Sequence, residues 1–153
     1  MEQRWASRGW RALVAIVLAA LAVGVAAQDQ RSGTLKTVQG KVSISHGEAR
    51  RAAQPGGGVA EAERISTGPD SAAVLLLRDG TLITVGPNAQ VDISRFQFDA
   101  TAQTGGLTVT VLVGTVRLVT GLLGKLQPDN VKVQTPSSTV AVRGTDFVVE
   151  VPQ

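Results

Sequence analysis

The stretch from Thr135 to Val151 alternates apolar with small or polar residues, and the alternation changes phase at one glycine. Apolar residues occupy even positions before Gly144 and odd positions after it; they are Val140 and Val142, then Phe147, Val149 and Val151. Because successive side chains of a strand point to opposite faces, a shift by one residue requires a turn or a bulge. The stretch therefore predicts two strand segments separated at Gly144.

Two local structures produce such a break. In the first, Gly144 and Thr145 form a tight two-residue turn. The cross-strand pairs would then be Val142 with Phe147, Val140 with Val149, and Arg143 with Asp146. In the second, Gly144 is a bulge inside one long strand. Both alternatives give Gly144 a backbone conformation that a side chain resists. In the turn, Arg143 and Asp146 would form an ion pair that sets the register, which we favour over a role in recognition.

Composition points to the same fold class. The 153 residues include 17 glycines, no tyrosine and no cysteine, and only 3% are aromatic. Abundant valine, threonine and glycine favour strands separated by turns over helices. We therefore expect an all-β fold, with stacked β-hairpins that form a sandwich or a solenoid-like domain. Without disulfides, the domain must be stabilised by packing.

The dipeptide Gly-Thr occurs at three of the expected strand junctions. It is found at Gly80–Thr81, at Gly114–Thr115 and at Gly144–Thr145. At Gly114 the apolar residues again change phase, from odd positions after Leu107 to even positions from Val116 onward. Three similar junctions suggest related hairpin units stacked side by side.

The strongest hairpin signal is Asp79-Gly80 between two apolar runs, Val74–Leu77 and Leu82–Val85. With these two residues as the loop, the expected pairs are Arg78 with Thr81, Leu77 with Leu82, and Leu76 with Ile83. Both faces of this hairpin would then be apolar. Such a hairpin is covered on both sides, which we favour, or it presents one side as a contact surface.

Two segments nearer the N-terminus carry weaker signals. Leu35–Ser45 predicts a strand with a bulge at Gly40. Glu48–Gly58 contains two arginines, a proline and three consecutive glycines. This composition predicts an exposed loop without a strand.

The N-terminus has the features of an export signal, for which we expect a signal helix. Three arginines precede the uncharged apolar run Ala12–Ala27, which ends in small residues of the kind that a signal peptidase accepts. The run is shorter than the ~20 residues of a spanning helix. We expect cleavage after Ala27, then a linker over 28–34 and one domain over 35–153, located in the periplasm or cell envelope. An uncleaved signal anchor is the alternative, and it would be the only contact with a membrane.

Removal of the signal changes the charge of the chain. The whole sequence has 15 basic and 12 acidic residues, a net charge of +3. Without Glu2 and the three N-terminal arginines, 12 basic and 11 acidic residues remain. No basic patch interleaved with aromatic residues follows, so the composition argues against nucleic-acid binding.

The sequence offers little for catalysis or for metal and cofactor binding. His46 is the single histidine, in an expected turn beside Ser45 and Glu48, where a histidine is usually inert. There is no cysteine, and the aspartates lack the spacing of a calcium loop. The glycines at 56–58 lack the lysine and the strand-to-helix context of a phosphate loop. We therefore expect a protein that is not an enzyme and that has no cofactor or metal.

Three blocks of the sequence together resemble the FecR domain: Glu63–Val91, then V-G-T-V at Val113–Val116, then Val133–Phe147. The best-known proteins of this type are transmembrane regulators. Their periplasmic part senses an iron-loaded outer-membrane transporter, and their cytosolic part controls an extracytoplasmic-function sigma factor. The resemblance implies a periplasmic FecR-like domain with motif residues that are structural or contact a partner. Only Met1–Arg11 precedes the apolar run, which is too little for a cytosolic sigma-factor-binding domain, so we expect a stand-alone domain. These residues are Asp79, Gly80, Thr81, Gly114, Thr115, Arg143, Gly144, Thr145, Asp146 and Phe147.

Two function classes follow. The preferred one is an exported, non-catalytic binding or signalling module that contacts another envelope protein, with a link to transport or sigma-factor regulation. The alternative is a structural envelope protein or a surface module that binds glycan or peptidoglycan. Both tryptophans lie in the signal and tyrosine is absent, which argues against a cleft that stacks sugars.

Overall fold

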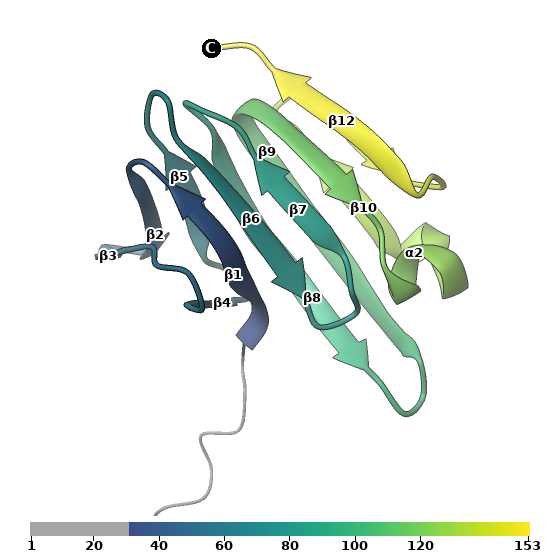
Figure 1. The fold of residues 1–153 in the computed structure, drawn as a ribbon. Coiled ribbons are helices and arrows are strands. Elements are labelled where there is room, and N and C mark those ends of the chain that lie inside the picture. Colours follow the sequence, from purple (N-terminus) through teal and green to yellow (C-terminus); the bar gives the residue numbers. More distant parts are fainter. Residues whose placement is uncertain (1–30) are drawn as a thin grey trace, which may run out of the picture. The chain divides into compact units, whose positions relative to one another are not determined.

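The computed structural model describes residues 31–153, which form one continuous and mostly antiparallel β-sheet (Figure 1). The predicted signal segment, Met1–Ala27, lies outside the described residues. The strands are β1 (Arg31–Gln39), β2 (Val42–His46), β3 (Ala49–Ala52), β4 (Gly58–Ala60), β5 (Arg64–Thr67), β6 (Ala72–Leu77), β7 (Leu82–Val85), β8 (Gln90–Asp99), β9 (Thr104–Val119), β10 (Val131–Gln134), β11 (Thr139–Ala141) and β12 (Asp146–Val151). Between β9 and β10 lie a short helix, α2 (Leu122–Leu126), and the 3-10 turn η2 (Pro128–Asn130). Within residues 31–153, no helix has the length and apolar character needed to cross a membrane.

The 16-residue strand β9 joins the two parts of this sheet. Its first half pairs with β8 and, in parallel, with β10. Its second half pairs with β7 and β12. We call β1, β4, β6, β7, β12 and the second half of β9 sheet A. The first half of β9 with β2, β3, β5, β8, β10 and β11 is sheet B.

The two sheets curl so that their inner faces share one core. Leu35, Leu75 and Ile83 of sheet A belong to the same buried cluster as Ile65 and Val109 of sheet B. Burial of each such side chain contributes roughly 1.5–3 kcal/mol relative to exposure. The predicted all-β class is confirmed, and its form is a continuous curled sheet.

Gly114 is the point at which β9 passes from sheet B to sheet A. Its φ is +92°, a value that favours glycine. A Cβ atom built at this position would lie 2.5 Å from the Cβ of Ala89. The buried residues change from odd to even positions across it, from Val111 to Val116. The predicted change of phase is therefore confirmed, and it lies within one strand, where β9 passes from sheet B to sheet A.

The hairpin predicted at Asp79-Gly80 is also present, but its register was wrong. The loop has three residues, because Leu76 pairs with Leu82 and the Leu77 amide donates to the Thr81 carbonyl (2.8 Å). Gly80 has φ +86°, as expected at the last position of such a loop. The inward residues are Ala73, Leu75, Leu77, Ile83 and Val85. The opposite face of this hairpin is half-exposed, so the prediction that both of its faces are buried was wrong.

The hairpin predicted at Gly144-Thr145 was wrong. β11 pairs with β10 in sheet B, whereas β12 pairs with β9 in sheet A. The bulge alternative fails for the same reason, since the segments before and after Gly144 belong to different sheets. Gly144 has a φ outside the left-handed region, and no atom lies within 4 Å of a Cβ built there. The residue is a corner between two sheets, and its conformation does not require glycine.

The strand predicted over Leu35–Ser45 is divided at Gly40, where φ is +70°. β1 lies in sheet A and starts already at Arg31, and β2 lies in sheet B. The segment predicted as a loop, Glu48–Gly58, contains β3 and the first residue of β4. Both differences arise because the chain crosses between the two sheets here, and neighbouring strands supply pairing partners that local composition does not reveal.

The Gly-Thr dipeptides at 80–81, 114–115 and 144–145 lie in different local structures. The first ends a hairpin loop, the second lies within β9 where this strand passes from sheet B to sheet A, and the third is a corner between sheets. The hypothesis of stacked, related hairpin units was therefore wrong.

Candidate functional site

The loop between β6 and β7 holds the end of β9 through buried polar contacts. The Thr81 hydroxyl donates to Oδ2 of Asp79 (2.7 Å), and the Gly121 amide donates to Oγ1 of Thr81 (3.0 Å). The amide of Leu122 donates to the Asp79 carbonyl (2.8 Å). A Cβ atom at Gly121 would lie 2.2 Å from that carbonyl oxygen. Asp79, Gly80 and Thr81 are therefore structural residues that position the start of α2.

Thr120 connects this loop to the third Gly-Thr dipeptide. Its amide donates to the Thr145 carbonyl (2.9 Å), and its hydroxyl donates to the Gly144 carbonyl (3.1 Å). The structure thus brings the motif residues 79–81 and 144–145 to one end of sheet A. The motif residues Gly114 and Thr115 lie apart from them, where the Gly86 amide donates to the Thr115 carbonyl (2.9 Å). Thr120 and Gly121 were not predicted from the sequence, because nothing in their local pattern indicates these long-range hydrogen bonds.

The predicted ion pair between Arg143 and Asp146 was wrong. Arg117 in β9 donates to both carboxylate oxygens of Asp146 (2.9 and 2.5 Å), and Arg143 donates to Asp129 of η2 (2.9 Å). The partners differ because β11 and β12 diverge into separate sheets. The hydrogen bonds from Arg117 lower the pKa of Asp146, and the same bonds raise the pKa of Arg117. Both groups are exposed, so solvent screens the pair.

The outer face of sheet A carries apolar side chains that lie outside the buried core. One cross-strand row contains Leu76, Leu82 and Val119, and the next contains Val74, Thr84, Arg117 and Val148. Val148 is 60% exposed. Phe147, the last motif residue, faces the other way and packs against the core. We call the residues of these two rows the outer face of sheet A.

β12 is an edge strand next to this face. Among residues 31–153 it pairs only with β9 (Figure 1). The register is unbroken from Asp146 opposite Val119 to Val151 opposite Gly114. Natural edge strands are commonly protected by charged side chains, above all lysine, by proline or by a bulge. The six residues of β12, D-F-V-V-E-V, include the charged Asp146 and Glu150 but no lysine and no proline, and no bulge interrupts their pairing with β9. Its free backbone edge is therefore open to another strand.

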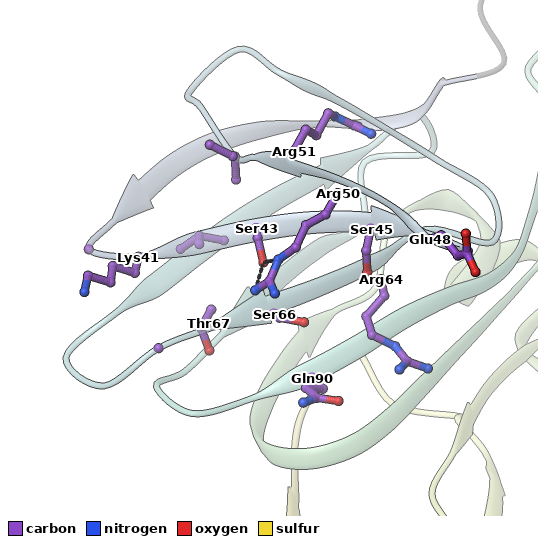
Figure 2. A pocket seen from close by; sticks show the side chains of 16 residues that line it. Lys41, Ser43, Ser45, Glu48, Arg50, Arg51, Arg64, Ser66, Thr67 and Gln90 are labelled. Carbon is purple, nitrogen blue, oxygen red and sulfur yellow. Dashed lines mark hydrogen bonds between the residues drawn. The ribbon is translucent and has the colours of Figure 1, made fainter.

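A polar groove of about 1040 Å³ lies on the outer face of sheet B (Figure 2). Its floor includes the half-exposed Ser43, Ser45 and Ser66, which alternate with buried residues of β2 and β5. Arg50 of β3 extends over this floor, where its Nε and Nη2 donate to the Ser43 hydroxyl (3.0 and 2.8 Å). The sequence pattern did not reveal the groove, because five of its sixteen lining residues, Arg50 among them, come from the segment predicted as a loop.

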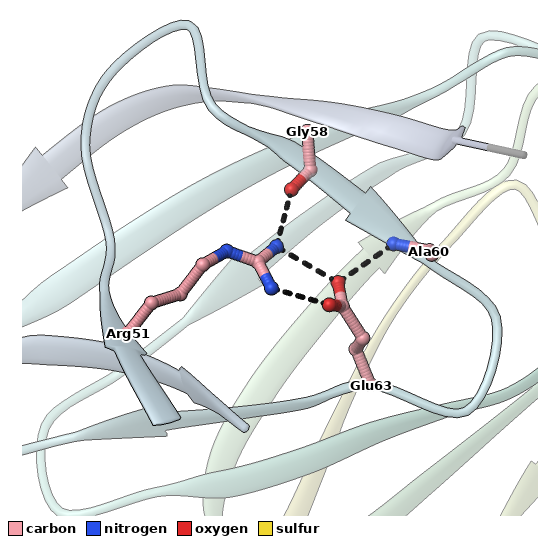
Figure 3. Close-up of polar contacts among 4 residues, drawn as sticks. All are labelled: Arg51, Gly58, Ala60 and Glu63. Carbon is pink, nitrogen blue, oxygen red and sulfur yellow. Dashed lines mark hydrogen bonds and ion pairs between the residues drawn. The ribbon is translucent and has the colours of Figure 1, made fainter. Parts of the chain in front are cut away.

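Arg51, which also lines the groove, pairs with Glu63 and so ties β3 to the segment between β4 and β5 (Figure 3). Arg51 donates to both carboxylate oxygens of Glu63 and to the Gly58 carbonyl (2.8 Å), and the Ala60 amide donates to Oε2 of Glu63 (2.8 Å). Burial favours the neutral form of Glu63, but the bonds from Arg51 and Ala60 outweigh it and lower its pKa. The pair is structural, because its donors and acceptors are directed at one another.

Outside these contacts, the titratable side chains of residues 31–153 form no cluster with an evident chemical role. His46 is exposed at the end of β2, opposite Ala49. Among residues 31–153, no group of three or more histidine, cysteine or acidic side chains is placed to hold a metal ion.

The fold and its surfaces define a class: a small all-β domain with an exposed sheet face, an open strand edge and a charged groove. The chain matches the family described as FecR protein over residues 63–153. It belongs to this family, which is associated with sigma-factor regulation in envelope signalling. The match starts at Glu63, so β1–β4 precede it although they complete the same sheet. No curated protein and no solved structure matches the chain.

Proposed function

We propose that the protein is an exported, non-catalytic binding module of the cell envelope, and that it engages another envelope protein at β12. The observation that carries this proposal is the open edge of β12 beside the outer face of sheet A. The signalling association of the FecR family supports the same class of function. The partner we propose is a protein with an extended segment that adds to β12 as a further strand.

The free edge of β12 supplies backbone donors and acceptors for such a segment. Each hydrogen bond of the added strand contributes about 0.5–1.5 kcal/mol after exchange with water. The side chains that alternate along β12 would select the partner's residues. Val148 offers an apolar contact on the outer face, continuous with the row that contains Arg117 and Thr84.

Charge narrows the chemistry of the partner. Asp146 is already paired with Arg117, whereas Glu150 has no ion-pair partner among residues 31–153. Opposite charges across a strand pair are favourable, and like charges are unfavourable. The added segment should therefore place a lysine or arginine opposite Glu150.

The experiment is site-specific photo-crosslinking in the native envelope with the whole protein. A photoreactive residue at position 148 tests β12, and one at position 140 is the matched control. Val140 is also a highly exposed valine, 54% against 60%, but it lies in β11 of sheet B. Position 148 should give one discrete adduct, with a crosslinked peptide that is extended and basic. Equal adducts at both positions, or none at 148, would contradict the proposal.

A second variant tests the edge itself. Lysine on an edge strand opposes the addition of another strand, so Val148→Lys should lower the yield of the adduct formed from position 152, just after β12, by about tenfold. Val140→Lys introduces the same charge in sheet B and should leave the yield unchanged. A circular-dichroism melt of both variants separates loss of binding from loss of folding. An unchanged adduct in a folded Val148→Lys protein would argue against strand addition.

A further inference from the structure

The groove on the outer face of sheet B has cationic side chains that the protein does not neutralise. Four line it, Lys41, Arg50, Arg51 and Arg64, against the single acidic residue Glu48. Arg51 is paired with Glu63, and Arg64 donates to both carboxylate oxygens of Asp92 (2.6 and 2.9 Å). Arg50 bonds only the neutral Ser43 hydroxyl, and Lys41 has no acidic partner in the part of the chain that the structure describes. Two positive charges are thus available to a ligand.

The floor between these cations offers side-chain hydrogen bonds and no free backbone edge. β2 is paired on both sides, by β3 and β5, and β5 is paired by β2 and β8. A peptide strand therefore cannot add to the floor as it can at β12. The available groups are the hydroxyls of Ser43, Ser45 and Ser66 and the amide of Gln90 (Figure 2). Hydroxyls both donate and accept, so they suit a ligand that is itself rich in hydroxyl groups.

None of the described residues that line the groove is aromatic. A neutral sugar would thus lack the stacking surface on which many carbohydrate sites depend. Affinity must come from charge, and a guanidinium fork matches the geometry of a carboxylate. The volume of about 1040 Å³ lies at the upper end of the range for ligand pockets, which suits a short chain of sugar residues.

We propose that this groove binds an acidic sugar chain, with Arg50 and Lys41 on the carboxylates and the serine hydroxyls on the sugar hydroxyls. On binding, Arg50 would exchange the neutral Ser43 hydroxyl for a charged oxygen, which forms a stronger hydrogen bond. This inference goes beyond the proposed binding at β12, because it uses other residues and another sheet. The proposed binding at the groove and the proposed binding at β12 can therefore be confirmed or contradicted independently.

The test is calorimetric titration of the purified protein with trigalacturonate, with maltotriose as the neutral sugar of the same length. Trigalacturonate should bind saturably and more weakly at higher salt, since added ions screen exposed charges. Arg50→Gln keeps a donor for Ser43 but removes the charge, and it should weaken binding by about tenfold. The matched control is Arg143→Gln, which removes the same charge from an exposed arginine that does not line the groove. The control should bind as the wild type does.

Amide chemical shifts of the wild-type protein give a readout that does not depend on any variant. Trigalacturonate should shift the amides of Ser43, Ser45 and Ser66 and leave those of β12 unchanged. Four results would overturn the proposal: no saturable binding, equal binding of maltotriose, equal loss in Arg143→Gln, or shifts outside the groove. Tighter binding of an oligoglutamate peptide than of trigalacturonate would also overturn it, because the site would then select acidic peptides.

Discussion

Thr81 donates its hydroxyl hydrogen to Oδ2 of Asp79 over 2.7 Å, and the two residues are only 1% and 2% exposed. The same Thr81 oxygen accepts a hydrogen bond from the Gly121 amide, so one side chain links the hairpin loop to the end of β9. Thr81→Val has nearly the same shape but leaves a buried carboxylate and a buried amide with fewer partners. It should lower the free energy of unfolding by about 1–3 kcal/mol, measured by urea denaturation. Thr84→Val, on the exposed face of β7, is the control and should change it by less than about 0.5 kcal/mol. Equal effects would show that the Asp79 network contributes nothing specific.

Two glycines before threonine should differ strongly in their response to the same substitution. Gly114→Ala places a Cβ 2.5 Å from Ala89 at φ +92°, which requires a backbone shift. We expect a loss of at least about 2 kcal/mol from combined strain and overpacking. Gly144→Ala meets no atom within 4 Å, and its φ lies outside the left-handed region. Its effect on the free energy of unfolding should be below about 0.5 kcal/mol. A large loss at Gly144, or none at Gly114, would contradict the geometry of β9 and of the corner.

The Arg51–Glu63 pair should make stability depend on acid pH. The folded pKa of Glu63 lies below its ordinary value of 4.5, so its contribution is complete above that value and is lost as the pH falls through the folded pKa. Glu63→Gln removes this contribution. Between about pH 5 and about pH 3, the wild type should therefore lose more stability than the variant, as urea denaturation would show. Glu150→Gln, an exposed carboxyl in β12, should keep the wild-type pH dependence. A Glu63→Gln protein with an unchanged acid response would show that the pair is not coupled to folding.

Export predicts a defined mature N-terminus. Cleavage after Ala27 should leave a chain that begins at Gln28, and intact-mass spectrometry of the protein from its native envelope measures this directly. An intact Met1 on the envelope-bound protein would instead indicate the uncleaved signal anchor.

Local patterns predicted the features of this fold that depend on neighbours in the chain. The phase change at Gly114 is visible because side chains alternate with period two, whatever the strand pairs with. The loop at Asp79-Gly80 was found from turn chemistry, but its length was not, because two-residue and three-residue loops use similar residues. The family resemblance was confirmed over residues 63–153.

The candidate sites depended on distant segments, and they were largely missed. The groove needs β3, β2 and β5 side by side, and its Arg50 lay in a segment predicted as a loop. The edge at β12 exists only because β12 leaves β11 and pairs with β9. The phase change at Gly144 shows that the alternation is interrupted there. It does not show which strands pair with the segments before and after Gly144.

The sequence by itself determined the predominance of strands, the turn at Gly80, the change of phase at Gly114 and the family. Side-chain alternation and turn residues are properties of a few neighbouring positions, so they can be read locally. Only the tertiary structure decided that Arg143 and Asp146 form ion pairs with different partners and that β9 belongs to both sheets. The physical reason is that strands pair so that their apolar faces share one core. The segments that compete for these pairings lie far apart in the chain, so a local pattern does not reveal the outcome.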